Sequence, residues 1–432
     1  MQSCCCCYLI PIKTKMERII KLVLLLCLVA GREGLIGVNY GRVADNLPPA
    51  AQVARFLANS TTINRVRLFD SDRATVTAFS HTGIAVTVTV PTDEIPGLTK
   101  PYLAQEWVRT NILPHAHSTN IVRVLVGNEV LSTGNRLLIT TLVPAMQALH
   151  AALVEESLHD RIKISTPHSL GILSNSSPPS AGRFRQGYDV YVIRPLLSFL
   201  RMTDSPFMIN PYPFFGATEA TLDYALFRAN EGVVDGETGL VYGNMVDAQL
   251  DAVFSALRRM GFDDVDVVIA ETGWPSRGEA GQLGADAGTA AEYNRMVMRH
   301  VASGVGTPLM PNRTFETYIF ALFDEDLKPG PVCERSFGLF RPDLTPAYDI
   351  GILKAAANGG GGVRVGRSGL GLRPGSRHEC GLITTCPITL MWIQLQGEKL
   401  FQVMGIACMR GIDTVGLLII YGKKVKVSME TG

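Results

Sequence analysis

Short runs of β-branched residues alternate along the chain with longer stretches in which apolar residues recur at three- and four-residue spacing. The short runs are typical of buried strands, and the longer stretches are typical of amphipathic helices. Between residues 35 and 327 the pattern predicts eight strands: Leu35–Tyr40, Arg65–Phe69, Ile84–Val90, Ile121–Gly127, Lys163–Thr166, Pro206–Asn210, Val265–Ala270 and Tyr318–Phe323.

Helical segments separate these strands, among them Pro48–Ala58, Thr141–Ser157, Asp247–Met260 and Thr289–Ser303. Strands that alternate with helices form parallel βα units, and eight such units close into a barrel more readily than they spread into an open sheet. Periodicity alone leaves a doubly wound sheet as the alternative. We therefore predict an α/β protein with a single (β/α)8 TIM barrel over residues 35–357.

The N-terminal residues 1–34 have the character of a cleaved signal peptide. Arg18 and Lys21 precede an uncharged run, Leu22–Gly31, which is too short to span a bilayer. A buried first helix is the alternative. Met16 opens a more ordinary signal, so the residues before it would belong to an upstream leader. A transmembrane span in the mature protein is not predicted.

The C-terminal segment from residue 358 changes character. Four glycines begin at Gly359, and a basic stretch and apolar runs without a coherent period follow. We predict an irregular tail over residues 358–432. The chain ends in polar residues, whereas a lipid-anchor signal ends in an apolar run.

Composition adds little to the electrostatic picture. The 432 residues are 47% hydrophobic, which supplies a large core, and 40 basic against 39 acidic residues give a net charge of +1. No attraction to nucleic acid follows from that balance. Of nine cysteines, only Cys333 lies in the body of the barrel, and no metal-ligand spacing occurs. We expect neither a metal nor another cofactor.

Three glycosylation triplets agree with secretion: Asn59, Asn175 and Asn312.

Candidate chemistry lies where the predicted strands end. The fourth strand leads into Glu129 and the seventh into Glu271. The βα loops of a barrel meet at one face, so both carboxylates should reach the same mouth. A carboxyl pair of this kind serves glycoside hydrolysis, in which one group protonates the leaving oxygen and the other attacks or activates water. The alternative for each residue is a rim charge paired with arginine.

Four motifs in sequence order resemble the plant β-1,3-glucanases of glycoside hydrolase family 17, over about residues 35 to 354. The motifs are Gly37-Val38-Asn39-Tyr40-Gly41, Val126-Gly127-Asn128-Glu129-Val130, Asn210-Pro211-Tyr212-Pro213-Phe214-Phe215 and Ala270-Glu271-Thr272-Gly273-Trp274-Pro275-Ser276.

The resemblance implies a retaining mechanism with Glu271 as nucleophile and Glu129 as acid and base. Such a pair should lie about 5–5.5 Å apart, and mutual repulsion should hold Glu129 protonated. Asn128 would then bond the 2-hydroxyl of the sugar. The resemblance also implies a polar network of Glu325, Lys328 and Glu334, for which a solvated charged loop is the alternative.

Aromatic residues of the motifs are candidates for sugar contacts, because pyranose rings present apolar C–H faces. Tyr40 and Tyr212 are the first candidates. Phe214 and Phe215 are also candidates, but either could instead be buried in the hydrophobic core. Asn210 and Trp274 complete the set of residues predicted to bind substrate or support the site.

The resemblance implies hydrolysis of internal bonds of a β-1,3-glucan polysaccharide such as callose or a fungal wall glucan, with exo-acting cleavage, mixed-linkage substrates and glycosyl transfer as alternatives. The N-terminal segment and the glycosylation triplets predict secretion to the apoplast or cell wall, and we expect a monomer. Membrane-anchored or vacuolar locations are the alternatives. A second hypothesis for the function is a wall protein that binds β-glucan on the same barrel without cutting it. The presence of both Glu129 and Glu271 favours the enzyme.

Overall fold

The structure, a computed structural model, describes residues 35–354, 404–405, 417–421 and 424–428. The chain divides into two units, Met1–Ala357 and Asn358–Gly432. The predicted signal peptide lies outside the described residues, as does most of the predicted tail. The described part of the second unit is a small antiparallel sheet, with strands that the hydrophobic pattern did not predict: β14 (Met404–Gly405), β15 (Leu417–Tyr421) and β16 (Lys424–Ser428).

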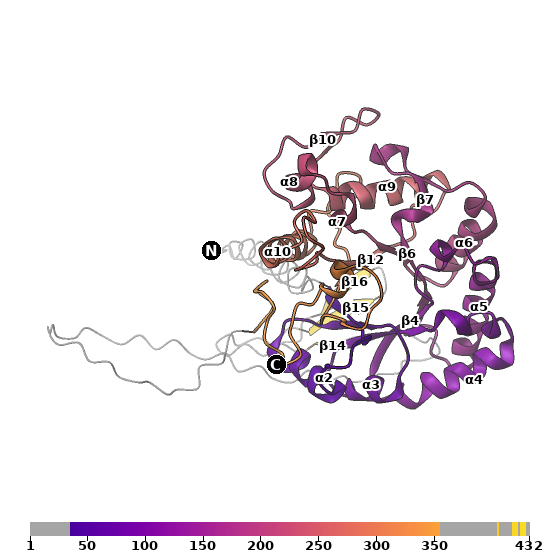
Figure 1. Cartoon of the computed structure of the whole chain (residues 1–432). Coiled ribbons are helices and arrows are strands. Elements are labelled where there is room, and N and C mark those ends of the chain that lie inside the picture. Colours follow the sequence, from indigo (N-terminus) through magenta and orange to yellow (C-terminus); the bar gives the residue numbers. More distant parts are fainter. Residues whose placement is uncertain (1–34, 355–403, 406–416, 422–423, 429–432) are drawn as a thin grey trace, which may run out of the picture. The chain divides into compact units, whose positions relative to one another are not determined.

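A ring of parallel strands forms the first unit (Figure 1). The strand order is β5-β4-β3-β2-β1-β13-β12-β9-β6, and each of the eight predicted strands overlaps an observed one. The (β/α)8 barrel is thereby confirmed. Its strands are β1 (Ile36–Tyr40), β2 (Arg65–Leu68), β3 (Ala85–Val90), β4 (Asn120–Val126), β5 (Lys163–Ser165), β6 (Pro167–Ser169), β9 (Phe207–Asn210), β12 (Val267–Thr272) and β13 (Thr317–Ile319).

The fifth strand continues beyond Thr166, where the prediction ended it, and Thr166 divides it into two short strands that close the ring. The first, β5, pairs with β4, and the second, β6, which was not predicted, pairs with β9. At the break, the Thr166 hydroxyl donates to the Val126 carbonyl at 2.9 Å, and the Glu129 amide donates to the Pro167 carbonyl at 3.0 Å. These bonds keep the divided strand attached to the end of β4, where the first candidate carboxylate lies.

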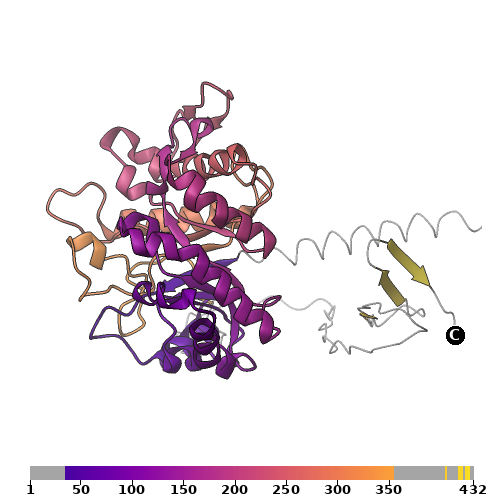
Figure 2. The same ribbon diagram turned by 90° about the vertical axis from the view of Figure 1, so that its right-hand side faces the viewer.

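Helices surround the strands, and Figure 2 shows the side covered by α4, α5 and α6. All four helices predicted by range are present, displaced by a few residues at most at their ends. The connection from β9 to the next long helix contains two short helices, and the segment from Phe320 to Lys354 has a 3-10 turn at Val332–Arg335 but no α-helix. The helices are α2 (Ala50–Ser60), α3 (Arg73–Ala78), α4 (Pro101–Asn111), α5 (Arg136–Glu155), α6 (Arg194–Met202), α7 (Pro213–Gly216), α8 (Leu222–Ala225), α9 (Met245–Arg259) and α10 (Ala287–Ser303).

The main core lies between the strands and the helices, because alternate strand residues point outward. A smaller cluster fills the barrel interior: Leu125, Met208, Val268, Ala270 and Tyr318. Helix α5 is long and apolar enough to cross a membrane by length and composition alone. Eight of its side chains are buried, so packing against the barrel accounts for its apolar face.

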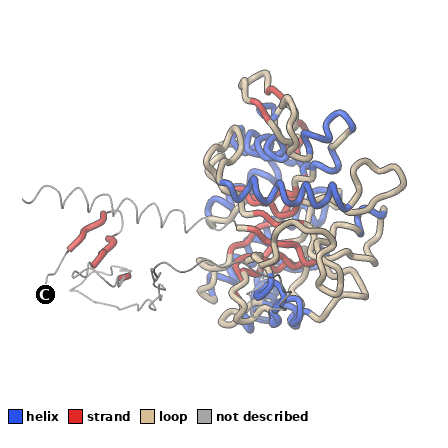
Figure 3. The backbone as a smooth tube through the Cα atoms, turned by 90° about the vertical axis from the view of Figure 1, so that its left-hand side faces the viewer, coloured by secondary structure: helices blue, strands red, loops and turns tan. Residues whose placement is uncertain are grey.

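Two short hairpins extend the loops at the carboxyl ends of the strands (Figure 3). The first joins β7 (Leu173–Asn175) to β8 (Arg183–Phe184) and follows β6. The second joins β10 (Val233–Val234) to β11 (Val241–Tyr242), within the connection from β9 to α9. Both therefore belong to the face of the barrel that carries active sites in this fold.

A buried ion cluster lies at the opposite end of the barrel interior. Both nitrogens of the Arg123 fork donate to Glu316, at 2.9 and 3.2 Å, and Tyr318 donates to the same carboxylate at 2.8 Å. Arg65 lies 3.7 Å from it. Burial by itself would raise the pKa of Glu316, but the two arginines outweigh that effect and lower the pKa to about 2.

Glu316→Gln should destabilise the fold by about 3–5 kcal/mol at pH 7, because it leaves Arg123 buried without its counter-charge. A carboxyl whose pKa falls from about 4.5 when unfolded to about 2 when folded stabilises the protein above pH 4.5. That contribution disappears as the pH falls toward 2. The free energy of unfolding, measured in urea, should therefore differ between wild type and variant by less at pH 3 than at pH 7. A difference independent of pH would contradict this account.

Candidate active site

Glu129 follows β4 in a turn that needs two left-handed residues. Gly127 has φ +68°, and a Cβ added there would lie 2.6 Å from Val130 and 2.8 Å from Ile95, so only glycine fits. Glu129 itself has φ +50°. Such a conformation costs a non-glycine residue about 1–2 kcal/mol and is concentrated at functional sites. The turn brings the Glu129 side chain to the mouth of the barrel.

Glu271 lies within β12, and both of its oxygens are held by donors. Arg67 donates to Oε1 at 2.7 Å, and the Tyr212 hydroxyl donates to Oε2 at 2.9 Å. The carboxylate is only 6% exposed. Burial first, and then the charge of Glu271, raises the pKa of Tyr212 well above its usual value, so Tyr212 stays protonated and remains a donor.

Arg67 links the two halves of the site. Its guanidinium is fully buried and also donates to Asn128 Oδ1 at 2.8 Å and to Asn39 Oδ1 at 3.3 Å. It lies 4.5 Å from the centre of the Phe69 ring. One side chain therefore fixes Glu271 and the residue beside Glu129. Sequence reasoning missed this residue, although a charged residue at an inward position of a predicted strand was the available signal.

Glu129 has a different environment from Glu271. Asn210 donates to its Oε1 at 2.8 Å. Burial is the largest cause that raises the pKa of Glu129, and the negative charge of Glu271 is the second; the Asn210 bond opposes them. The sequence analysis named the charge of Glu271 as the cause, so the structure adds desolvation ahead of it.

A cleft of about 530 Å³ opens over both carboxylates. Eight of the residues predicted from sequence line it: Asn128, Glu129, Asn210, Tyr212, Phe215, Glu271, Lys328 and Glu334. Phe215 is 59% exposed, so its ring is available to a ligand. The cleft thus combines two carboxylates, amide groups, a cation and aromatic faces.

Four other predicted residues do not line the cleft. Tyr40 is 2% exposed and packs edge-on against Phe323, so the prediction that it presents a ring to a sugar does not fit its burial. Phe214 occupies a core position against Trp274, which is the alternative considered for it. Trp274 has no exposed surface and donates to the Gly284 carbonyl at 2.8 Å. Of the three rings, Phe214 packs against Phe215 and Phe337, which line the cleft, and so supports its wall from behind.

Glu325 is the fourth of these residues, and it connects the loops after β1 and β13. It accepts a bond from the Val43 amide at 3.0 Å and lies 3.8 Å from Lys328. A Cβ at Gly41 would come within 2.3 Å of its carboxylate, which explains the glycine after Tyr40. Glu325 is therefore placed to position Lys328, whose ammonium lies 4.4 Å from the centre of the Phe320 ring.

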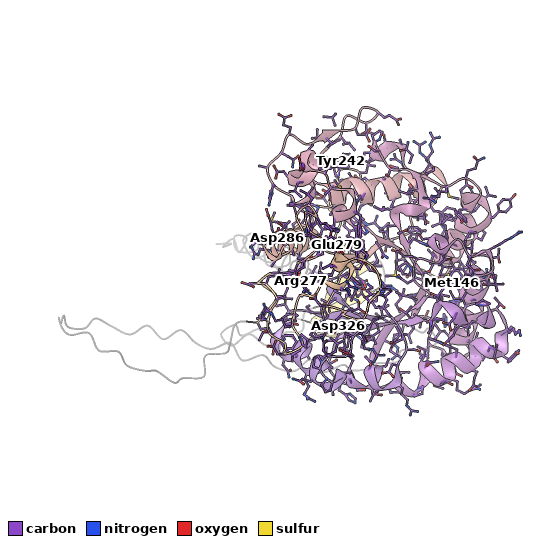
Figure 4. All side chains as sticks on the ribbon, in the orientation of Figure 1. Met146, Tyr242, Arg277, Glu279, Asp286 and Asp326 are labelled. Atoms are coloured by element: carbon purple, nitrogen blue, oxygen red, sulfur yellow. The ribbon has the colours of Figure 1, made fainter. Side chains whose placement is uncertain are left out.

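Polar contacts between loops hold the segment that carries Lys328 and Glu334. Three residues that make these contacts, Arg277, Glu279 and Asp326, are labelled in Figure 4. Arg277, in the loop after β12, pairs with Asp324 at 2.9 Å, and Glu279 accepts from the Val332 amide at 2.9 Å. Asp326 accepts from Asn46 at 3.0 Å. The loops after β1, β12 and β13 are thereby tied together around the cleft.

Several lining residues were not predicted, because none of them belongs to one of the four motifs. They are Ser169, Leu170, Gly171, Gly216, Gln249, Phe320 and Phe337. Gln249, on α9, has a buried Oε1 without a partner among the described residues. Gln249 reaches the site because α9 lies beside the mouth of the barrel. The sequence pattern did not predict that position.

The structure also locates the predicted glycosylation sites and tests for metal-binding groups. Asn59, Asn175 and Asn312 are all exposed, so each remains accessible for the predicted modification. Within the described residues, no group of three or more His, Cys, Asp or Glu side chains is arranged to hold a metal ion.

Comparison with known proteins gives concordant matches. The sequence model for "Glycosyl hydrolases family 17" matches residues 36–352. A glucan endo-1,3-beta-glucosidase of Triticum aestivum is 43% identical over 403 residues, covering 85% of this chain and 87% of the relative. Glucan endo-1,3-beta-glucosidase 7 of Arabidopsis thaliana is 46% identical over 331 residues, covering 76% of this chain and 65% of the relative.

Solved structures give the same picture. CJP38, a β-1,3-glucanase and allergen of Cryptomeria japonica pollen, matches with a TM-score of 0.69 and 40% identity, covering 73% of this chain and 98% of that one. A plant β-glucan endohydrolase, described as one of two with distinct substrate specificities, matches with a TM-score of 0.66 and 36% identity, covering 72% of this chain and 99% of that one.

Proposed function

The chain belongs to glycosyl hydrolase family 17, and we propose that it hydrolyses internal β-1,3-glucosidic bonds of β-1,3-glucans with retention of configuration. The observation that carries the proposal is the pair of carboxylates in one cleft, in contrasting environments. Arg67 and Tyr212 hold Glu271 for attack. The pKa of Glu129 is raised, which favours the protonated form that donation requires.

In the first step, a carboxylate oxygen of Glu271 attacks the anomeric carbon while the bond from that carbon to the leaving sugar oxygen breaks. Glu129 gives its proton to the leaving oxygen, so the departing chain leaves as a neutral alcohol. The sugar remains attached to Glu271 as an ester. Esterification removes the negative charge of Glu271, which is the second cause of the raised pKa of Glu129.

In the second step, Glu129 is ionised and acts as the base. It takes a proton from water, whose oxygen attacks the anomeric carbon as the bond to Glu271 breaks. Glu271 regains its charge and Glu129 regains its proton, so the site returns to its starting state. Two inversions at one carbon give a product of the original β configuration.

Neighbouring groups would hold the sugar during both steps. Arg67 donates to Oδ1 of Asn128. The Asn128 amide nitrogen can therefore donate to the 2-hydroxyl of the sugar. Phe215 offers an exposed ring. Lys328 and Glu334 supply further polar groups to the cleft, while Glu325 positions Lys328.

The substrate follows from the relatives, whose names specify glucan endo-1,3-β-glucosidases. A linear β-1,3-glucan such as callose or a fungal wall glucan fits that activity. We further propose that residues 1–34 are a signal peptide, that residues 35–357 are the catalytic domain, and that the protein acts outside the cell as a glycosylated monomer. The tail from residue 358 has no part in the proposed reaction.

Incubation of the purified chain with laminarin tests the proposed activity. New reducing ends should accumulate, and products of several lengths should appear early, as expected for cuts inside a chain. The competing function, a glucan-binding wall protein, predicts that laminarin is retained but never cut. Binding without any release of reducing ends would therefore exclude the enzymatic proposal.

Glu271→Gln should lower the pKa of Glu129, because it removes a nearby negative charge. The pKa should stay above that of an exposed glutamate, about 4.3, because burial, the larger cause, remains. Carbon-13 NMR of labelled Glu129 in both proteins measures the two values. An unchanged pKa in the variant would exclude charge coupling and would leave desolvation as the sole cause of the raised pKa.

The raised pKa also predicts that activity falls as the pH rises through it, since Glu129 then loses the proton it must donate.

A further inference from the structure

A second cavity, of about 690 Å³, lies outside the catalytic cleft and is lined by residues of the β7–β8 hairpin, α6 and the C-terminal end of α9. Figure 1 labels β7, α6 and α9. Three arginines line it, Arg183, Arg194 and Arg259, and all three are exposed. We call it the arginine groove. The mechanism described above uses none of its residues.

The arginine groove carries a net positive charge, because three arginines face one carboxylate. Within residues 35–354, none of its three guanidinium groups forms a salt bridge. Asp189 is the one acidic residue in its lining, and its Oδ1 already accepts the amides of Gly187 and Val190 at 2.9 and 2.8 Å. Arg259 donates to the Ser180 carbonyl at 2.7 Å, which fixes its position without neutralising it. The groove therefore attracts an anion.

The positive surface continues to the edge of the catalytic cleft. Arg185 is exposed two residues after Arg183, and the buried Phe184 lies between them, so both arginines project on the outer side. The Arg185 guanidinium lies 4.0 Å from the position that a Cβ would take on Gly171, and Gly171 lines the cleft. A chain molecule lying along this row would pass beside the cleft.

We propose that the arginine groove binds a polysaccharide that carries carboxylate groups, that is, one containing uronic acid residues. The planar guanidinium fork matches a carboxylate with two parallel hydrogen bonds, and three such forks without lysine favour carboxylate recognition over diffuse charge. Val190 and Tyr191 beside the groove are 56% and 82% exposed and offer apolar surface to sugar rings. The net charge of +1 gives no general attraction to nucleic acid or membrane.

Such binding would hold the enzyme close to any neutral glucan that lies beside the acidic polymer. A second attachment raises the effective concentration of the catalytic cleft near that surface without any change in the cleft itself. The inference concerns binding alone, so it stands or falls separately from the proposed hydrolysis. Its probes are polygalacturonate, which is charged, and fully methyl-esterified polygalacturonate, which is not.

The test is retention of the full chain on immobilised polygalacturonate across a salt series. The double variant Arg183→Glu/Arg194→Glu should bind at least about tenfold more weakly, a change of about 1.4 kcal/mol, and its binding should depend less on salt. The matched control is Arg55→Glu/Arg73→Glu, which makes the same charge change at exposed residues of α2 and α3. It should stay within about twofold of wild type beyond the small effect of net charge.

Neither double variant should change laminarin hydrolysis when no acidic polymer is present. The methyl-esterified polymer should not retain the wild type. Equal weakening by both pairs would show an effect of net charge alone and would overturn the proposal. Failure of the wild type to bind polygalacturonate would also overturn it, as would tighter binding to vesicles of anionic phospholipid.

Discussion

Glu271→Gln should lower the turnover of laminarin by about 10⁴-fold or more, because an amide cannot form the glycosyl ester. The variant should lose stability, as Glu316→Gln does, because it leaves Arg67 buried without its counter-charge. It should still fold under the assay conditions, since glutamine has the same shape and its amide oxygen can still accept from Arg67. Steady-state rates and circular dichroism measure both expectations. Glu316→Gln is a matched control, because it also removes a carboxylate from a buried arginine pair but lies outside the cleft. That variant should lose stability while each folded molecule keeps its turnover.

Trapping of the intermediate identifies the nucleophile directly. A 2-fluoro glycoside with a good leaving group should form a stable ester on Glu271, visible as a mass increase on the peptide that contains it. Glu271→Gln should remain unlabelled. Labelling of another carboxylate in the wild type would remove Glu271 from the role, whatever the variant does to the rate.

Arg67→Leu should have the second largest effect, because Arg67 fixes Glu271 and Asn128 together. Its loss leaves Glu271 buried without a counter-charge, at a cost of about 3–5 kcal/mol of stability. We expect turnover per folded molecule to fall by about 10²-fold or more, since a misplaced nucleophile loses much of its rate advantage. Arg67→Lys retains the charge without the fork, so its activity and stability should lie between those of wild type and Arg67→Leu.

A positioning role of Arg67 is separated from a purely structural one by measuring kcat at a temperature and urea concentration where both wild type and Arg67→Leu are folded. A positioning role predicts a lower kcat under those conditions. An unchanged kcat accompanied only by a lower unfolding free energy would show that Arg67 is merely structural.

The sequence predicted the barrel well because its strands carry a strong apolar signal and are separated by helical periods. It also proposed Glu129 and Glu271 as the reacting pair, since both lie at strand ends within recognisable motifs, and the structure places both in one cleft. It did not predict the division of the fifth strand at Thr166, because three-residue strands have too few positions to show a period. Nor did it locate the loops that form the walls of the cleft.

Burial was the other property that sequence alone did not supply. Tyr40 and Trp274 lie in motifs, but the fold places both beneath the surface, whereas Phe215 lies in the cleft and its neighbour Phe214 lies in the core. Arg67 reaches Glu271 across 204 positions of sequence. Contacts of that kind depend on the three-dimensional closure of the barrel, which no local pattern encodes.

The stereochemistry of hydrolysis tests the central claim most directly. Proton NMR, recorded while the enzyme cuts a β-1,3-gluco-oligosaccharide, shows the configuration of each new reducing end before it equilibrates in solution. Double displacement through Glu271 predicts that the β anomer appears first and the α anomer grows only by later equilibration. Initial formation of the α anomer would show a single displacement by water and would contradict the proposed roles of Glu271 and Glu129.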